Sequence, residues 1–210
     1  MTLTKNNLAC FIIILFHVTA VIGVSIGFQD WFIAKTPLNL LVVTVLFFIL
    51  FPIASKRNII LFLMFFGLSI FAEWLGVTYG LIFGEYSYGA NFGPKVSGVP
   101  LFIGAKWAIL TFVSSRISHR FLKSKWLISL SGASFMLLLD FFMEKSAPVF
   151  DFWEFKGGIA PLQNYVGWFG LAFLFQYILN IKKNEGNLAI SYTIYFAQLL
   201  FFLYFFFYNS

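Results

Sequence analysis

The sequence predicts an all-α, polytopic membrane bundle of about seven transmembrane helices, with residues 1–210 forming a single transmembrane domain. Apolar residues make up 60% of the 210 residues and charged residues only 10%, whereas soluble domains contain about 45–50% and about 25%. A chain of this length has too little interior to hide so much apolar side chain from water. The apolar residues form continuous runs without the alternation of a β-barrel strand, so helices are the structure that satisfies the backbone in lipid.

Seven apolar windows approach or reach the roughly 20 residues that a spanning helix needs. They lie at residues 8–28, 38–55, 59–83, 98–115, 126–143, 164–181 and 188–208. The first window follows only Lys5 and ends without a convincing small-x-small cleavage site. It therefore predicts a retained first helix rather than a cleaved signal peptide.

The Lys and Arg residues divide unequally between the two sides of the membrane that these windows define. Nine of the 14 lie on the side of the N-terminus: Lys5, Lys56, Arg57, Arg116, Arg120, Lys123, Lys125, Lys182 and Lys183. Four lie on the other side: Lys35, Lys95, Lys145 and Lys156. Because cytoplasmic loops carry the excess of basic residues, we predict a multi-pass protein of the inner cell membrane with a cytoplasmic N-terminus and an external C-terminus.

The acidic residues sort in the opposite direction, since only Glu185 of the eight falls on the predicted cytoplasmic side. The outer loops at residues 84–97 and 144–163 are the longest and contain Gly, Pro and aromatic residues. Loops of this kind often carry function. The cytoplasmic connections at residues 56–58 and 182–187 are short, and we expect them to be structural.

Charged side chains fall at a similar depth in three predicted helices, near the outer third of the membrane. Glu73 lies in the third window, Lys106 in the fourth and Asp140 in the fifth. Glu144 follows Asp140 by four residues and shares its helical face if the helix continues that far. Ionisable residues within a span usually face the interior of the bundle, so we expect these four side chains to converge.

Small residues recur at every fourth position beside Glu73. This small-residue stripe consists of Ala72, Gly76, Gly80 and Gly84. Such a stripe lets another helix approach closely, which places Glu73 on an interior face.

Two interpretations of the four charges stay open at this point. One is a structural ion-pair network, in which one carboxylate neutralises Lys106 and the others accept hydrogen bonds. The other is acid–base chemistry. Three carboxylates against one ammonium leave surplus negative charge in a low-dielectric environment, and desolvation with like-charge repulsion favours the protonated form of at least one carboxyl. A carboxylic acid that stays protonated near neutral pH can act as a general acid.

Several functional classes are excluded by what the sequence lacks. The single Cys10 excludes a disulfide framework and a Cys-based metal site, and His17 and His119 lie in different segments. Nucleic-acid-binding motifs are missing, and the window at 188–208 contains no Lys to form a retinal Schiff base. The Asp-x-x-x-Glu pattern at residues 140–144 has no second partner, which disfavours an intramembrane prenyltransferase.

Polar side chains also interrupt the first and last windows. His17 lies in the middle of the first, where we expect an interhelical hydrogen bond rather than catalysis. Ser191, Tyr195 and Gln198 share a face of the last window, which suits either the lining of a pocket or contacts between helices.

Two stretches of the chain carry a resemblance to a known family. The first comprises Glu73-Trp74-Leu75-Gly76-Val77, Phe83-Gly84-Glu85-Tyr86-Ser87-Tyr88, Gly93-Pro94, Gly98-Val99-Pro100 and Trp107. The second comprises Asp140, Glu144, Trp153, Ile159-Ala160-Pro161-Leu162, Asn164-Tyr165 and Trp168. Together, over residues 70–170, they resemble the membrane carotenoid-biosynthesis family that includes carotenoid 1,2-hydratases and bisanhydrobacterioruberin hydratases.

The resemblance implies hydration of the terminal carbon–carbon double bond of an acyclic, lycopene- or γ-carotene-like carotenoid, giving a tertiary alcohol. The partners would be this substrate, water and membrane lipid, with no nucleic acid, no metal and no other cofactor. The catalytic candidates are Glu73, Asp140 and Glu144 as acid and base, with Lys106 tuning them by its charge. The substrate-binding candidates are Trp74, Tyr86, Tyr88, Trp107, Trp153, Asn164, Tyr165 and Trp168.

The chemistry itself fits these residue types. Protonation of an isolated alkene needs a dry acid, and the resulting cation is stabilised by aromatic faces within about 6 Å. For the Trp and Tyr candidates the competing interpretation is the aromatic belt of a membrane interface. For the whole protein it is a non-enzymatic carotenoid or lipid binder, or a transporter, that uses the same pocket.

Overall fold

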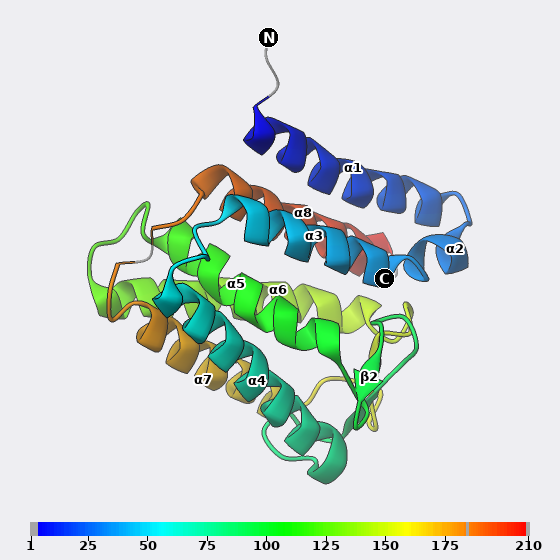
Figure 1. The fold of residues 1–210 in the computed structure, drawn as a ribbon. Helices are drawn as coiled ribbons and strands as arrows, with labels where there is room; N and C mark the ends of the chain where they lie inside the picture. Colours follow the sequence, from blue (N-terminus) through cyan, green and yellow to red (C-terminus); the bar gives the residue numbers. More distant parts are fainter. Residues whose placement is uncertain (1–3, 184, 209–210) are drawn as a thin grey trace.

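The protein, represented by a computed structural model, is described at residues 4–183 and 185–208. Within these residues the helices are α1 (Lys5–Ser25), α2 (Gln29–Ile33), α3 (Thr36–Leu50), α4 (Lys56–Tyr79), α5 (Leu101–Ser118), α6 (Lys125–Ser146), α7 (Leu162–Leu179) and α8 (Leu188–Tyr208). The strands are β1 (Tyr86–Tyr88), β2 (Lys95–Val96), β3 (Val99–Pro100) and β4 (Trp153–Phe155). Figure 1 shows the long helices packed side by side as a bundle, with the strands gathered at one end.

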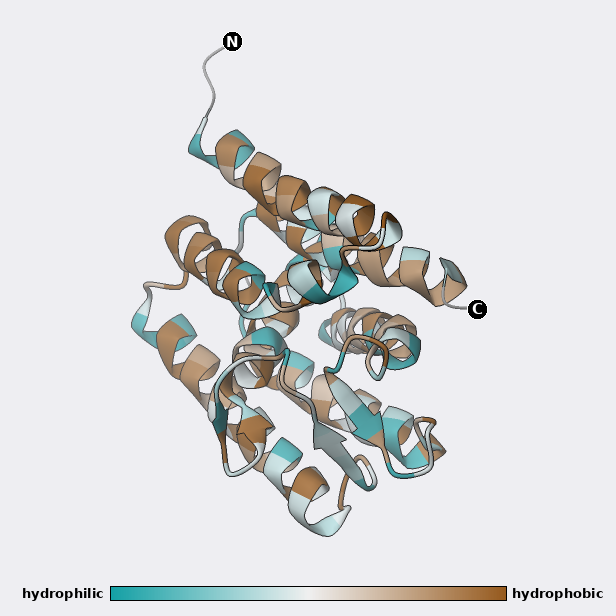
Figure 2. Cartoon of the chain, turned by 90° about the vertical axis from the view of Figure 1, so that its right-hand side faces the viewer, coloured by the Kyte–Doolittle hydropathy of each residue, from teal (hydrophilic) through white to brown (hydrophobic). Residues whose placement is uncertain are grey.

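The predicted all-α membrane bundle is confirmed. In the described part of the chain, six segments are long and apolar enough to cross a membrane: α1, the α2–α3 unit (Gln29–Leu50), α4, α5, α6 and α8. Helix α7 occupies the remaining predicted window and is 18 residues long, but it carries Gln163, Asn164 and Gln176. Figure 2 shows the hydrophobic colour concentrated on the helices, whose outer faces expose side chains such as Phe11, Ile49 and Leu63.

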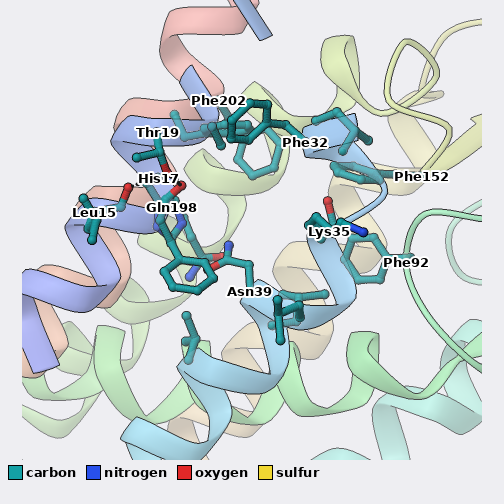
Figure 3. A pocket seen from close by; sticks show the side chains of 18 of the residues that line it. Leu15, His17, Thr19, Phe32, Lys35, Asn39, Phe92, Phe152, Gln198 and Phe202 are labelled. Atoms are coloured by element: carbon teal, nitrogen blue, oxygen red, sulfur yellow. Dashed lines mark hydrogen bonds between the residues drawn. The ribbon is translucent and has the colours of Figure 1, made fainter. Parts of the chain in front are cut away.

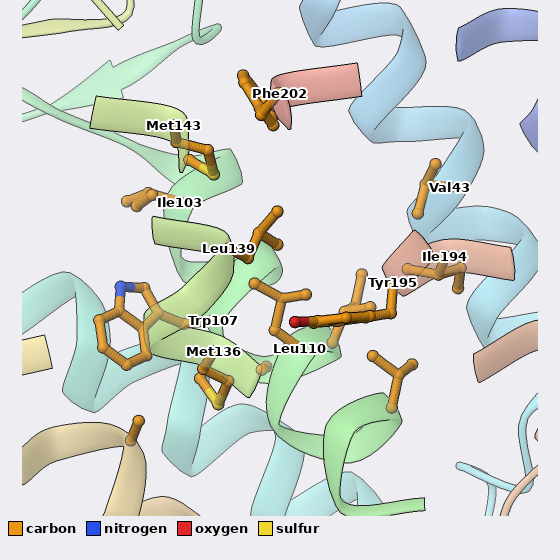
Figure 4. Close-up of a cluster of buried hydrophobic side chains, with 14 of the residues drawn as sticks. Val43, Ile103, Trp107, Leu110, Met136, Leu139, Met143, Ile194, Tyr195 and Phe202 are labelled. Atoms are coloured by element: carbon orange, nitrogen blue, oxygen red, sulfur yellow. The ribbon is translucent and has the colours of Figure 1, made fainter. Parts of the chain in front are cut away.

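Helix α5 lies at the centre of the bundle and packs against α3, α4, α6, α7 and α8 (Figure 1). Fifteen of its 18 residues are buried, as expected of a helix surrounded by others. The absence of a side chain at Gly104 brings α4 close, because a Cβ there would lie 2.8 Å from Ile70 Cγ1. Figure 4 shows Trp107 and Leu110 of α5 beside Met136 of α6 and Tyr195 of α8 in the core.

The two long outer loops are joined by an antiparallel pair of strands that the sequence did not predict. Strands β1 and β4, here called the aromatic ribbon, pair in the register Tyr86↔Phe155, Ser87↔Glu154 and Tyr88↔Trp153. Because side chains alternate along a strand, the four aromatic residues point to one face, and Ser87 and Glu154 are exposed on the other. The ribbon thus places aromatic rings over the ends of α4 and α6.

The ends of the helices differ from the predicted windows by a few residues. The third window extends to residue 83, whereas α4 ends at Tyr79 because Gly80 adopts a left-handed conformation with φ of +66°. Helix α6 continues to Ser146, so Glu144 lies on the helix one turn beyond Asp140.

Candidate active site

Three carboxyl groups converge beneath the aromatic ribbon, around a small cavity of about 10 Å³ that we call the carboxyl cavity. Its lining consists of Glu73, Asp140, Glu144, Asn164, Tyr86, Tyr88, Trp153, Trp168, Phe83, Ile103 and Phe155. Space of this size holds about one water molecule. The chain therefore surrounds a single water-sized space with three carboxyls and a wall of aromatic rings.

Glu73 of α4 accepts hydrogen bonds from three side chains. Tyr88 Oη donates to Oε2 at 2.8 Å, Trp107 Nε1 donates to Oε1 at 2.9 Å, and Tyr86 Oη also donates to Oε2. Burial, reinforced by the nearby Glu73 carboxylate, holds the pKa of Tyr86 and of Tyr88 well above the usual value of 10. Both hydroxyls therefore remain donors, and the three bonds match a carboxylate that only accepts.

The small-residue stripe has a local role at this site. A Cβ at Gly76 would lie 2.7 Å from Tyr86 Cε1, so the missing side chain admits the tyrosine ring one helical turn from Glu73. The neighbour at this position is therefore Tyr86 rather than the second helix that the stripe predicted. Gly80 caps α4 and Gly84 lies beyond it, so the stripe does not run along a single helix.

Asn164 of α7 links the other two carboxyl groups. Its Nδ2 donates to Asp140 Oδ2 at 3.2 Å and to Glu144 Oε1 at 2.8 Å. Trp153 Nε1 of the ribbon donates to Glu144 Oε2 at 3.0 Å. The remaining oxygen of the pair, Asp140 Oδ1, is buried and has no hydrogen-bond partner among the described residues. Buried polar atoms are rarely left unpaired, so this oxygen marks a position where a bound molecule would be held.

Lys106 lies at the predicted depth but faces away from the carboxyl cavity. Its Nζ is 2.7 Å from Met143 Sδ and lies 5.7 Å from the ring centroid of Phe92 and 5.4 Å from that of Phe202. Among the described residues the ion pairs are Lys156–Glu85 and Lys183–Glu185, both exposed. The ion-pair network that was one interpretation of the four charges is therefore not formed, and Lys106 acts on Asp140 and Glu144 only through space.

The aromatic and polar candidates also divide into residues that line the carboxyl cavity and residues that do not. Tyr86, Tyr88, Trp153, Trp168 and Asn164 line the cavity. Trp107 lies directly behind it, stacked on Trp168 with ring centroids 3.8 Å apart.

Two candidates lie elsewhere, and three lining residues were not predicted. Trp74 packs on Phe71 and Tyr79 on another face of α4, and Tyr165 packs on Phe141. Phe83, Ile103 and Phe155 were missed. They are apolar residues in an apolar chain, although Phe83 stands in the stretch that carries the family resemblance and Phe155 pairs with Tyr86 in the ribbon.

No group of three or more His, Cys, Asp or Glu in the described part of the chain is arranged to hold a metal ion. His17 donates from Nδ1 to the Ile13 carbonyl of its own helix at 2.8 Å, and it forms no interhelical hydrogen bond among the residues that the structure describes. Tyr195 does link two helices, through its hydroxyl to the Phe135 carbonyl at 2.8 Å.

A family model described as carotenoid biosynthesis protein matches residues 35–209, which include all three carboxyls of the cavity. The chain belongs to this carotenoid biosynthesis family. It is also 26% identical, over 134 residues, to a bisanhydrobacterioruberin hydratase of Haloarcula japonica. The match covers 57% of this chain and 43% of that protein, so the chain spans less than half the length of this relative. No solved structure matches.

These matches confirm the family that the residues of α4, the ribbon and α6 indicated. They support a role in carotenoid biosynthesis for this multi-pass membrane protein.

Proposed function

We propose that this carotenoid biosynthesis protein is a hydratase that adds water to the terminal carbon–carbon double bond of an acyclic carotenoid. The observation that carries the proposal is the carboxyl cavity, where three carboxyls and several aromatic rings surround space for about one water molecule. Such a site offers an acid, a place for water and a cation-stabilising wall. The hydratase name of the related Haloarcula japonica protein supports the same chemistry.

Asp140 is the proton donor in this mechanism. Because its Oδ2 accepts a hydrogen bond from Asn164, the proton of the acid form belongs on Oδ1, which has no partner in the described part of the chain. The proton passes from Oδ1 to the less substituted alkene carbon, and the π electron pair forms the new C–H bond. The positive charge then rests on the tertiary carbon.

Glu73 and the aromatic wall stabilise that cation. The carboxylate of Glu73, fixed by three donors, supplies negative charge across the cavity. Each aromatic face within about 6 Å contributes roughly 0.5–2 kcal/mol of cation–π attraction. Trp168 has the strongest claim because it lines the cavity and is held in place by stacking on Trp107.

Water completes the reaction. Glu144, oriented by Asn164 and Trp153, holds the water molecule, whose oxygen forms the C–O bond at the tertiary carbon. The extra proton of the added water returns to the Asp140 carboxylate, which restores the acid. The sum is one alkene and one water converted to one tertiary alcohol, with no other reactant.

The size of the cavity adds a requirement. Space for about one water molecule does not admit a carotenoid end group, so the lining side chains must separate when the substrate enters. We place the site in the outer half of the inner cell membrane, with the N-terminus cytoplasmic, on the distribution of Lys and Arg.

Expression of the chain in a lycopene-producing bacterial host tests the proposal. We expect extracted pigments that have gained the mass of one water for each reacted end, and no such gain with Asp140→Asn. Glu154→Gln is the matched control, since Glu154 is exposed on the outer face of the ribbon. Unchanged pigment masses with the wild-type chain, at confirmed expression, would leave carotenoid binding without chemistry as the function. Full hydration by Asp140→Asn would remove Asp140 from the acid role.

A further inference from the structure

A second and much larger cavity lies on the other side of Lys106. It has a volume of about 380 Å³ and is lined by α1, α2, α3 and α8 and by Lys106 of α5, with Phe92 and Phe152 of the outer loops at one end (Figure 3). We call it the lateral cavity. This volume falls within the roughly 300–1,000 Å³ that small-molecule sites occupy.

The walls of the lateral cavity are suited to a hydrocarbon chain. Most of the lining is aliphatic or aromatic, including Phe16, Leu40, Val43 and Phe201. Leu15 of α1 and Leu38 of α3 line the cavity and also expose more than two fifths of their surface, at 43% and 49%. In a membrane these exposed apolar side chains face lipid, so the cavity opens laterally to the bilayer.

The inner wall, by contrast, is polar. His17 of α1, Asn39 of α3, Lys106 of α5 and Gln198 of α8 all line it. Figure 3 shows His17 and Gln198 close together on one side of the view and Phe92 and Phe152 on the other. His17, Lys106 and Gln198 are buried, each at 9% exposure or less.

Hydrogen-bonding capacity is left over on this wall. His17 uses Nδ1 within its own helix, which leaves Nε2 as an acceptor. Asn39 Oδ1 is buried and finds no hydrogen-bond partner in residues 4–183 and 185–208, and Lys106 Nζ contacts the weak acceptor Met143 Sδ. Buried polar groups without partners are costly. A ligand for this cavity should therefore combine an apolar chain with a polar group at its inner end.

The atoms left over on this wall select a neutral polar group. His17 Nε2 and Asn39 Oδ1 are both acceptors, so each needs a hydrogen-bond donor from the ligand. A carboxylate or another anionic group cannot donate a hydrogen bond and would leave both acceptors unpaired. A hydroxyl both donates and accepts, which matches an amine beside an imidazole acceptor and an amide oxygen.

We propose that the lateral cavity binds a long isoprenoid alcohol, with the chain along α1 and α3 and the hydroxyl at the wall formed by His17, Asn39, Lys106 and Gln198. The choice of an isoprenoid rests on the proposed function, whose product carries a tertiary hydroxyl. The lateral cavity is then the site where a hydrated chain end is held, with Lys106 of its inner wall in contact with Met143 of the helix that carries Asp140 and Glu144.

Binding to the purified full-length chain in nanodiscs tests the proposal. The probes are lycopene and 1-hydroxy-1,2-dihydrolycopene, detected by quenching of the protein's tryptophan fluorescence. We expect the alcohol to bind about fivefold more tightly, the effect of roughly one net hydrogen bond. His17→Leu should reduce this preference without preventing binding of the chain.

Cavity-filling variants locate the site. Val43→Trp should weaken binding of the alcohol at least tenfold, on the order of one lost chain segment in an apolar pocket. Val45→Trp on the same helix is the control, because Val45 is 47% exposed and does not line the cavity. Ala20→Phe fills the cavity from α1 and serves if Val43→Trp fails to fold.

Competition with oleyl alcohol and oleate, which share a chain and differ in the head group, tests the neutral head. Stronger competition by oleate would identify an anionic-lipid site and overturn the proposal. So would equal affinity for both carotenoids, or wild-type binding by the cavity-filling variants. If cells make no hydrated pigment while Val43→Trp weakens binding of the alcohol, the proposed hydratase function is refuted and the lateral binding site stands. If pigments are hydrated while binding ignores the cavity, only this inference fails.

Discussion

Asn164 offers the sharpest test of the carboxyl cavity, because one amide group donates to two carboxyls. Replacement by Leu, which is of similar size, removes the hydrogen bonds at 3.2 Å to Asp140 and 2.8 Å to Glu144. Glu144 keeps its bond from Trp153, whereas Asp140 loses its donor and the reason for its proton to reside on Oδ1. The acid would then be present but not oriented.

The expected loss follows from the strength of such bonds. A hydrogen bond to a charged group contributes about 1.5–3 kcal/mol, and each 1.36 kcal/mol of transition-state stabilisation is tenfold in rate. Asn164→Leu should therefore lower the hydration rate by roughly 10- to 100-fold. The rate is measured as hydrated pigment formed per unit of protein, in membranes supplied with lycopene.

Gln163→Leu is the matched control on the same helix. Its amide donates to the Gly80 carbonyl at 3.1 Å in an exposed position outside the carboxyl cavity. We expect at least half of the wild-type rate. An Asn164→Leu variant that also retained half of the rate, at equal protein level, would refute the role of Asn164 in orienting Asp140 and Glu144.

Three further predictions concern packing, pH and topology. Gly76→Ala should destabilise the protein by about 1–3 kcal/mol through overpacking and lower the rate of carotenoid hydration, since the new Cβ would meet the Tyr86 ring. Gly67→Ala on the same helix is the control, because a Cβ there meets nothing within 4 Å. Thermal unfolding in detergent compares the two variants, and equal midpoints would contradict the steric argument. Because burial raises the pKa of Tyr86 and Tyr88 in the folded state, their contribution to stability is fully present below about pH 10 and is lost as the pH rises further. The fall in the unfolding midpoint above pH 10 should be smaller in the variant with both tyrosines changed to Phe. An equal fall in the two proteins would refute a role of these tyrosines in the pH dependence of stability. A periplasmic phosphatase reporter should be active when fused after the last residue and inactive in the connection at residues 51–55, and the reverse pattern would invert the proposed orientation.

The fold follows from the sequence because lipid fixes the length of each element. All seven predicted windows correspond to helical segments, since a span needs about 20 apolar residues with every backbone group paired internally. The residues at which the helices end were less predictable. Gly80 stops α4 through its left-handed conformation, and nothing in the apolar run up to residue 83 indicates which glycine acts as the cap.

The carboxyls of the site were predictable because ionisable residues in a span must face the interior. The direction of Lys106 was not. Helix α5 is buried on all sides, so its sequence has no polar face that distinguishes a neighbour bearing carboxyls from one bearing phenylalanines. Depth along the helix brought Lys106 to the right layer, but rotation about the helix axis directed it to the lateral cavity.

The aromatic ribbon was beyond sequence reasoning for a different reason. Strands β1 and β4 have three residues each and lie more than 60 residues apart, so no local periodicity signals their pairing. Their register depends on side chains that the bundle presents, such as the Glu73 carboxylate beneath Tyr86 and Tyr88.

This dependence makes the ribbon the element that joins the two halves of the site. Strand β1 supplies Tyr86 and Tyr88 to Glu73, and strand β4 supplies Trp153 to Glu144. If the ribbon moves aside to open the water-sized cavity to a carotenoid end group, Glu73 and Glu144 lose hydrogen-bond donors. The site is therefore complete only when the ribbon is closed, and an end group that entered by displacing the ribbon would break the hydrogen bonds of Glu73 and Glu144.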